Sequence, residues 1–151
     1  MILDVDGVLT NGTKVYDIDG NVVHKVFNDR DFTAIKRFKE EGVNVCFLSG
    51  DKKFNEEIAK KRKIDFFYGR NENGEMDKIS KLKKILIQYK SKKFAYVGDD
   101  YYDLEMIKSA DTGFCPNDAV DDIKKASDYV LNLKGSEGVV AEIFTIYIDN
   151  K

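Results

Sequence analysis

Acidic side chains gather in three short motifs of this sequence. The first motif is Asp4-Val5-Asp6-Gly7-Val8, the second is Ser49-Gly50-Asp51, and the third is Gly98-Asp99-Asp100 with Asp103 one turn later. In an extended segment Asp4 and Asp6 point to the same side, and Gly7 lets the backbone turn sharply beside them. Clustered carboxylates repel one another unless they are protonated or bridged by a cation. An all-oxygen set without histidine or thiolate suits a hard ion, and Mg²⁺ is the leading choice.

The combination of motifs is more informative than any one of them. A single aspartate in a turn or at a helix cap needs no functional explanation, and an isolated Asp-x-Asp is a common accident. Here an Asp-x-Asp-Gly-Val motif after the first apolar run is paired with a Gly-Asp-Asp-x-x-Asp motif after a later one. We therefore predict one site at which four acidic side chains and the Ser49 hydroxyl converge.

Each motif follows a short apolar run that predicts a β-strand. We expect strands at residues 1–5, 43–48, 65–68, 94–97 and 112–114. Apolar residues at helical spacing predict helices at residues 31–41, 76–89, 101–109, 120–126 and 139–147. This alternation indicates an α/β fold, namely a doubly wound, Rossmann-like parallel sheet with helices on both faces. In such sheets ligands bind beyond the carboxyl ends of the strands, where the motifs lie.

One segment after the first strand breaks this alternation. Residues 13–17 and 21–27 are separated by Asp19-Gly20, a pair typical of a β-hairpin turn, so we expect a hairpin inserted after the first strand. No linker, repeat or low-complexity tract interrupts the sequence, and residues 1–151 are predicted to form one domain without a large cap. Only three residues precede Asp4, so either residues are missing before Met1 or the first strand is unusually brief.

Composition and charge exclude several classes of partner. The sequence is 42% hydrophobic and 34% charged, which is typical of a globular domain, and its formal net charge of -2 creates no field that would attract nucleic acid or a membrane. No apolar stretch reaches the ~20 residues that cross a bilayer, and no signal-peptide layout is present, so we expect a cytoplasmic protein. Cys46 and Cys115 lie too far apart for a paired metal motif, and His24 has no second histidine, so neither residue type is predicted to be catalytic.

The acidic motifs resemble those of the haloacid dehalogenase-type phosphatase superfamily. The segment from Asp4 to Thr10 resembles its first motif, Ser49 with Gly50 the second, Lys78 the third, and the segment from Gly98 to Asp103 the fourth. Within the superfamily, the chain is similar to the small, capless members that hydrolyse 3-deoxy-D-manno-octulosonate 8-phosphate, and to relatives that act on nine-carbon keto-sugar acid phosphates. Further segments support this similarity, at residues 27–31, 95–100, 126–130 and 135–139.

The resemblance implies a Mg²⁺-dependent phosphatase that works through an aspartyl-phosphate. Asp4 would be the nucleophile, and Asp6 would protonate the leaving oxygen and then activate water. The metal would be held by Asp4, by the backbone carbonyl of Asp6 and by Asp99. Phosphate would be bound by Ser49, Gly50 and Lys78, with Asp100 and Asp103 behind the metal ligands. The resemblance also implies a keto-sugar acid phosphate as substrate and a homotetramer whose hairpins pack together.

Three departures from the pattern leave the substrate open, and one is that Gly135-Ser136-Glu137-Gly138 replaces the more usual paired glycines. Phe32-Thr33-Ala34 replaces a glycine-containing stretch, and the segment from Arg70 to Gly74 lengthens the loop before Lys78. A phosphatase for a nine-carbon sugar acid 9-phosphate is therefore an alternative, as is a non-catalytic regulatory module associated with a sugar-nucleotide synthetase. The intact acidic motifs argue against the module. A phosphotransferase would need a cap to exclude water, and a receiver domain would carry its phosphorylated aspartate after a middle strand.

Overall fold

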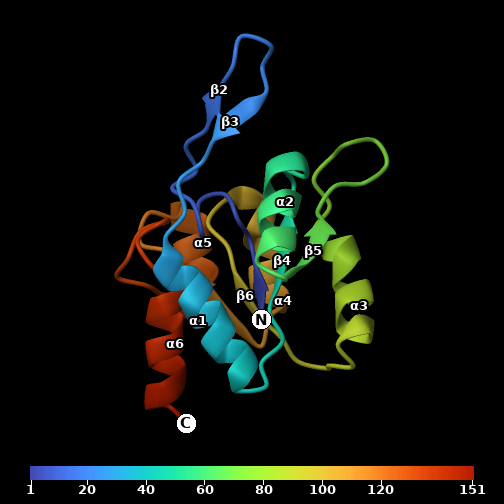
Figure 1. Ribbon diagram of the computed structural model, residues 1–151. Coiled ribbons are helices and arrows are strands. Elements are labelled where there is room, and N and C mark those ends of the chain that lie inside the picture. The colour runs from blue at the N-terminus through green and yellow to red at the C-terminus, as the bar shows by residue number, and fades with distance from the viewer.

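Six parallel strands form the central sheet, in the order β5-β4-β1-β6-β7-β8 (Figure 1). The computed structural model describes all residues, 1–151. The strands are β1 (Ile2–Leu3), β4 (Cys46–Ser49), β5 (Asp65–Tyr68), β6 (Ala95–Val97), β7 (Thr112–Cys115) and β8 (Tyr129–Val130). Although β1 comes first in the chain, it lies in the middle of the sheet, where it pairs with β4 on one side and β6 on the other. The predicted doubly wound parallel sheet is thereby confirmed.

Helices cover both faces of the sheet because its strands are apolar on both faces. One face is covered by α1 (Asp29–Glu40), α2 (Lys53–Lys61) and α6 (Val139–Asp149), and the other by α3 (Ile79–Gln88), α4 (Leu104–Ser109) and α5 (Asp121–Ala126). A 3-10 turn, η1 (Tyr101–Asp103), leads into α4. Alternate strand residues separate two cores: Leu3 and Phe47 belong to the first, whereas Ile2, Cys46 and Leu48 belong to the second. Continuous apolar strands of this kind are expected where both faces are buried.

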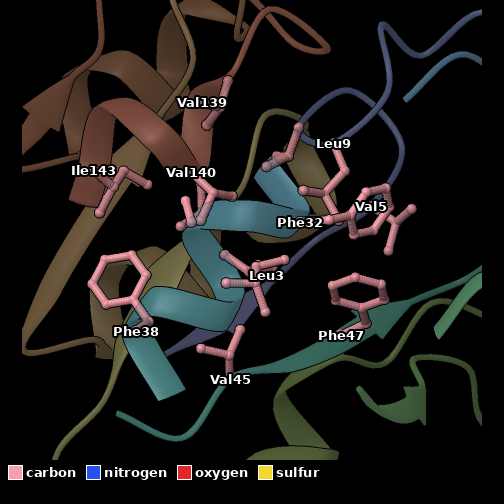
Figure 2. Packing of buried hydrophobic residues seen from close by; sticks show 14 of the residues in the cluster. Leu3, Val5, Leu9, Phe32, Phe38, Val45, Phe47, Val139, Val140 and Ile143 are labelled. Carbon is pink, nitrogen blue, oxygen red and sulfur yellow. The ribbon is translucent and has the colours of Figure 1, made fainter. Parts of the chain in front are cut away.

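The larger core joins the sheet to α1 and α6. Figure 2 shows Leu3, Val5 and Phe47 packed near side chains of these two helices, which include Phe32, Phe38, Val139, Val140 and Ile143. The two helices also contact each other directly, and the rings of Phe38 and Phe144 meet edge to face with centroids 4.9 Å apart. Helix α6, the last helix of the chain, is therefore packed against the first.

Helix α1 begins two residues earlier than the sequence predicts. Asn28 caps it, because its side-chain oxygen accepts a hydrogen bond from the Arg30 N–H, and Asp31 therefore lies in the first turn. The Asp31 side chain is buried, and its Oδ1 accepts hydrogen bonds from the N–H groups of Val140 and Ala141 at 2.7 and 3.2 Å. Asp31 thus joins the start of α1 to the start of α6.

The predicted hairpin is present and projects away from the sheet (Figure 1). It consists of β2 (Val15–Tyr16) and β3 (Val22–His24), so its paired region is shorter than the sequence suggests. Its turn is closed by Asp17, whose Oδ1 accepts hydrogen bonds from the N–H groups of Asp19 and Asn21. The side chains of the hairpin strands are largely exposed.

Three smaller features complete the fold. Strand β8 is absent from the sequence-based expectation, because two residues give too short a pattern to detect. The loop after β5 folds back on itself through an antiparallel bridge between Arg70 and Met76. Both cysteines are buried and free. No helix in the structure combines the length and the apolar character that crossing a membrane requires.

Candidate active site

Three aspartates meet at the carboxyl ends of β1 and β6. The Asp4 N–H donates a hydrogen bond to the Val97 carbonyl at 2.9 Å, which places the first motif directly beside the fourth. Carboxylate oxygens of Asp4, Asp99 and Asp103 lie within 4.8 Å of one another, and we call these three residues the acidic triad. Asp4 and Asp103 are buried, and Asp99 is partly buried. The sheet therefore brings together carboxylates that are almost 100 residues apart in the sequence.

The loop after β1 is held in place by close backbone contacts. Gly7 has a φ of +89°, and a Cβ at this position would lie only 1.9 Å from Asp99 Oδ2, so a larger residue would displace the aspartate. On the other side of the loop, a Cβ at Gly135 would lie 2.2 Å from the Gly7 carbonyl oxygen. The Ser136 N–H also donates a hydrogen bond to the Val8 carbonyl at 3.1 Å. The first motif is thus enclosed between Asp99 and the loop that precedes α6.

Asp103 organises the backbone of the fourth motif. Its Oδ2 accepts hydrogen bonds from the N–H groups of Asp99 and Asp100 at 3.0 and 3.2 Å, and its Oδ1 accepts one from the Tyr96 hydroxyl at 2.5 Å. Asp100, by contrast, is exposed, and its side chain accepts a hydrogen bond from the Tyr101 N–H. Of these two aspartates, only Asp103 belongs to the acidic triad.

Lys78 is the one cation in direct contact with the acidic triad. It lies immediately before α3 and is buried, with Nζ 2.8 Å from Asp4 Oδ1 and 2.6 Å from Asp103 Oδ1. Burial opposes its charged form, but the carboxylates of Asp4 and Asp103 outweigh that effect and raise the pKa of Lys78. The ammonium is therefore held in its charged form beside the predicted nucleophile.

The acidic triad carries more negative charge than Lys78 can balance. Burial raises the pKa of Asp4; Lys78 opposes that rise and Asp103 adds to it. The pKa of Asp99 is raised by burial and by the neighbouring Asp4 and Asp103 carboxylates. In addition, Asp99 Oδ1 is buried and has no hydrogen-bond partner. An all-oxygen group with a surplus of negative charge and an unpartnered oxygen fits a divalent cation such as Mg²⁺.

Asp6 lies in a second, adjacent group of side chains. Lys25 Nζ is 2.8 Å from Asp6 Oδ1 and 2.7 Å from Asp51 Oδ2, and we call Asp6 and Asp51 the lysine-paired carboxylates. Lys14 approaches the same two residues, at 3.7 Å from Asp6 and 3.2 Å from Asp51. Two carboxylates and two ammonium groups therefore balance each other in this group.

Two of the three predicted phosphate-binding residues, Ser49 and Gly50, border this second group. Ser49 is buried, and its Oγ accepts a hydrogen bond from Asn55 Nδ2 at 2.9 Å. Asn55 Nδ2 also lies 3.0 Å from Asp6 Oδ2, so one amide contacts both side chains. The Gly50 carbonyl accepts a hydrogen bond from Arg70 Nε at 2.8 Å, which fixes the loop after β5 beside the second motif.

The structure thus distributes the predicted site residues over two groups. Asp4, Lys78, Asp99 and Asp103 form one group, whereas Asp6 and Ser49 belong to the other. Sequence reasoning missed Lys14, Lys25 and Asn55. Lys25 lies in an alternating segment and Asn55 in a charged helical one, and no motif spacing connects either residue to Asp6.

Known proteins share both the fold and the sequence pattern. The chain is 34% identical, over 148 residues, to the 3-deoxy-D-manno-octulosonate 8-phosphate phosphatase of Haemophilus influenzae. This match covers 95% of this chain and 78% of that protein. The cobalt-bound structure of the Haemophilus influenzae phosphatase superimposes with a TM-score of 0.88 at 31% identity, covering 98% of this chain and 85% of the other. The Moraxella catarrhalis phosphatase, solved with magnesium, phosphate and 3-deoxy-D-manno-octulosonate, is similar in fold, with a TM-score of 0.88 at 24% identity and coverage of 99% and 85%.

The fold, the acidic motifs and these relatives together define an enzyme of the phosphatase class, which hydrolyses phosphoric monoesters. The sequence model that describes haloacid dehalogenase-like hydrolases matches residues 51–143. The chain belongs to the haloacid dehalogenase-like hydrolase family.

Proposed function

We propose that this phosphatase hydrolyses a keto-sugar acid phosphate, with 3-deoxy-D-manno-octulosonate 8-phosphate as its substrate, in a Mg²⁺-dependent reaction. The observation that carries the proposal is the acidic triad with Lys78, at the edge of the sheet where the first and fourth motifs meet. The Haemophilus influenzae relative, which is named for this substrate, supports the choice of sugar.

The reaction has two steps, and both begin at the first motif. Asp4 attacks phosphorus, the bond to the sugar oxygen breaks, and an aspartyl-phosphate forms on Asp4. Asp6 gives a proton to the departing sugar oxygen and then takes one from the water that hydrolyses the aspartyl-phosphate. Ser49 and the backbone at Gly50 hold the phosphoryl oxygens, and Lys78 neutralises one of them from its position beside Asp4.

The metal would be held at the acidic triad. Asp4, Asp99 and the backbone carbonyl of Asp6 are the proposed ligands, while Asp103 fixes Lys78 and the Asp99 backbone. When bound, Mg²⁺ supplies the positive charge that lets an anionic nucleophile approach an anionic phosphate. The unpartnered Asp99 oxygen and the surplus negative charge of the triad support this assignment.

A phosphate-release screen tests this proposal. Candidate substrates are 3-deoxy-D-manno-octulosonate 8-phosphate, a nine-carbon sugar acid 9-phosphate, simple hexose phosphates and p-nitrophenyl phosphate, each with Mg²⁺ and with EDTA. We expect the highest kcat/KM for the eight-carbon acid and no turnover in EDTA. A higher kcat/KM for the nine-carbon sugar acid 9-phosphate would make that ester the proposed substrate instead. If no ester released phosphate, the non-catalytic regulatory module would be favoured instead.

We also propose that the chain forms a homotetramer through its hairpins. Val15, Tyr16, Val23 and Val26 are each about half exposed, on a two-stranded hairpin that is marginally stable by itself. Packing of hairpins against one another would bury these side chains and enclose a site that has no cap. Light scattering checks this proposal: the parent protein should be tetrameric, and glutamate at Val15 and Val23 should dissociate it. A fully active parent monomer would contradict the proposed assembly.

A further inference from the structure

Lys25 is a fully buried lysine at the point where the hairpin returns to the domain. Its side chain has 0% exposure, and it lies directly after β3. Its ammonium contacts Asp6 in the loop after β1, Asp51 in the loop after β4, and Asn55 Oδ1 on α2 at 2.8 Å. An ammonium group has three donors, and here each of them has a partner on a different element.

These contacts extend from the hairpin to two predicted site residues. Asn55, which is itself fully buried, accepts a hydrogen bond from Lys25 and donates to both Asp6 Oδ2 and Ser49 Oγ. A lysine buried without partners would be costly, so Lys25 is held in place by the same carboxylates that it orients. Both carboxylate oxygens of Asp6 lie within 3.0 Å of its ammonium. The rotation of the Asp6 carboxylate is thereby fixed.

The segment next to Lys25 is anchored by aromatic packing. Phe27, two residues further along, stacks on Phe54 of α2 with ring centroids 6.4 Å apart and planes at 3°. It also contacts Phe32 of α1, at 5.8 Å between centroids. Lys25 Nζ itself lies 5.5 Å from the centroid of the Phe54 ring. The base of the hairpin is therefore fixed to two helices, and Lys25 reaches Asp6 from a defined position.

We propose that Lys25 is a positioning residue for Asp6. Through Lys25, the hairpin contributes to the active site. The inference rests on the proposed function, in which Asp6 passes protons. Lys25 does not touch the reacting atoms; it orients the Asp6 carboxylate for proton transfer, first to the sugar oxygen and then from water. Without Lys25, Asp6 loses its shortest contact and keeps those with Asn55, Thr10 and the more distant Lys14, so its carboxylate is held less firmly.

The test compares Lys25→Met with Lys14→Met in the full chain with Mg²⁺. Lys14 approaches the same two carboxylates, but its side chain is 25% exposed and its contacts are longer. For Lys25→Met we expect kcat on the sugar phosphate to fall by about 10²-fold, at the lower end of what acid–base catalysis contributes, with little change in KM. Lys14→Met should show a clearly smaller loss.

A rapid-mixing experiment with p-nitrophenyl phosphate separates positioning from general damage. This leaving group barely needs a proton, so Lys25→Met should still release one equivalent of p-nitrophenol in a burst and then turn over slowly, because hydrolysis of the aspartyl-phosphate still needs Asp6. If the single variant does not fold, the double variant Lys25→Met/Asp51→Asn takes its place, because it removes one charge of each sign. The double variant should give the same burst. Circular dichroism reports on the fold, and stabilisation by Mg²⁺ reports on the acidic triad.

The outcomes distinguish this inference from the proposed function. If the parent releases no phosphate from any ester, the proposed function fails. If the parent is active and a folded Lys25→Met retains the parental kcat on the sugar phosphate, the inference is overturned and the proposed function stands. A folded variant that loses activity on both substrates equally, without a burst, would show that Lys25 only supports the structure, and this too overturns the inference.

Discussion

The acidic triad and the lysine-paired carboxylates lie at the same edge of the sheet, but their charge is balanced in different ways. The triad shares a single lysine, Lys78, and leaves one oxygen of Asp99 without a partner. The lysine-paired carboxylates meet two lysines, Lys14 and Lys25, both from the hairpin segment. The triad therefore leaves room for a cation from solution, whereas the charges of the second group are balanced within the chain. The comparison therefore separates the proposed contribution of the metal from the proposed contribution of the hairpin.

Removal of the predicted nucleophile should have the largest effect. Asp4→Asn is expected to lower phosphate release by about 10⁴-fold or more, because an amide cannot attack phosphorus. The substitution also removes one charge from the under-balanced triad, so the Tm in EDTA should be equal to or higher than that of the parent. Steady-state assays and thermal unfolding measure the two effects. Turnover near the parental rate would refute the nucleophile assignment.

Substitution of Asp6 should have a smaller effect that depends on the leaving group. Asp6→Asn is expected to lower turnover of a sugar phosphate by about 10²- to 10⁴-fold, the usual range for acid–base catalysis. Release of p-nitrophenol in the first turnover should fall much less, because this group leaves without a proton. Rapid-mixing and steady-state assays on both substrates make the comparison. Equal losses on the two substrates would contradict the role of Asp6 as an acid.

Addition of metal should stabilise the triad and leave the lysine-paired carboxylates unchanged. A Mg²⁺ concentration of 1,000 times Kd would raise the free energy of unfolding by about 4 kcal/mol. Without metal, the raised pKa values of Asp4 and Asp99 mean that the folded chain binds more protons than the unfolded chain, so its stability falls as pH rises above the ordinary carboxylate range. Mg²⁺ should reduce that slope, and Ca²⁺, a larger ion with looser geometry, should suppress activity.

Thermal unfolding across pH in Mg²⁺, Ca²⁺ and EDTA measures these effects. Asp99→Asn is the matched control, since it should lose most of the stabilisation by Mg²⁺. Identical unfolding curves for the parent in Mg²⁺ and EDTA would show that the triad does not hold the ion.

Asp31 extends the comparison to a carboxylate that has neither a cation nor a predicted metal. Burial raises its pKa to about 6, although the Val140 and Ala141 N–H groups oppose the rise. Its contribution to stability should therefore decrease as pH rises from about 4 to 6, by at most about 3 kcal/mol. Asp31→Asn keeps an acceptor for the two N–H groups, and it should remove the part of the pH dependence of stability that comes from Asp31. Thermal unfolding across pH in saturating Mg²⁺ isolates the effect of Asp31. If the variant keeps the parental pH dependence of stability, Asp31 is not its source.

The sequence was sufficient to predict the sheet, except for β8, and the edge at which the candidate site lies. Buried parallel strands produce continuous apolar runs, and the motifs follow those runs directly. The orientation of individual side chains was harder to foresee: Asp100 and Asp103 belong to one short turn, yet Asp100 is exposed and Asp103 is buried. The contacts of Lys25 could not be predicted, because they depend on how the hairpin returns over α2, a tertiary contact that no local pattern encodes.

The central place of β1 in the sheet has a consequence for biosynthesis. The strand that leads to Asp4 is made before both of its neighbours, β4 and β6, and the loop after it is closed by Gly135 and Ser136. Such long-range pairing makes folding slow, because distant parts of the chain must meet before the contacts stabilise one another. On the ribosome, the proposed nucleophile Asp4 therefore emerges early, in a nascent chain that does not yet contain the other residues of the acidic triad. The loop that carries Asp4 is therefore enclosed only when the segment that precedes α6 has been synthesised.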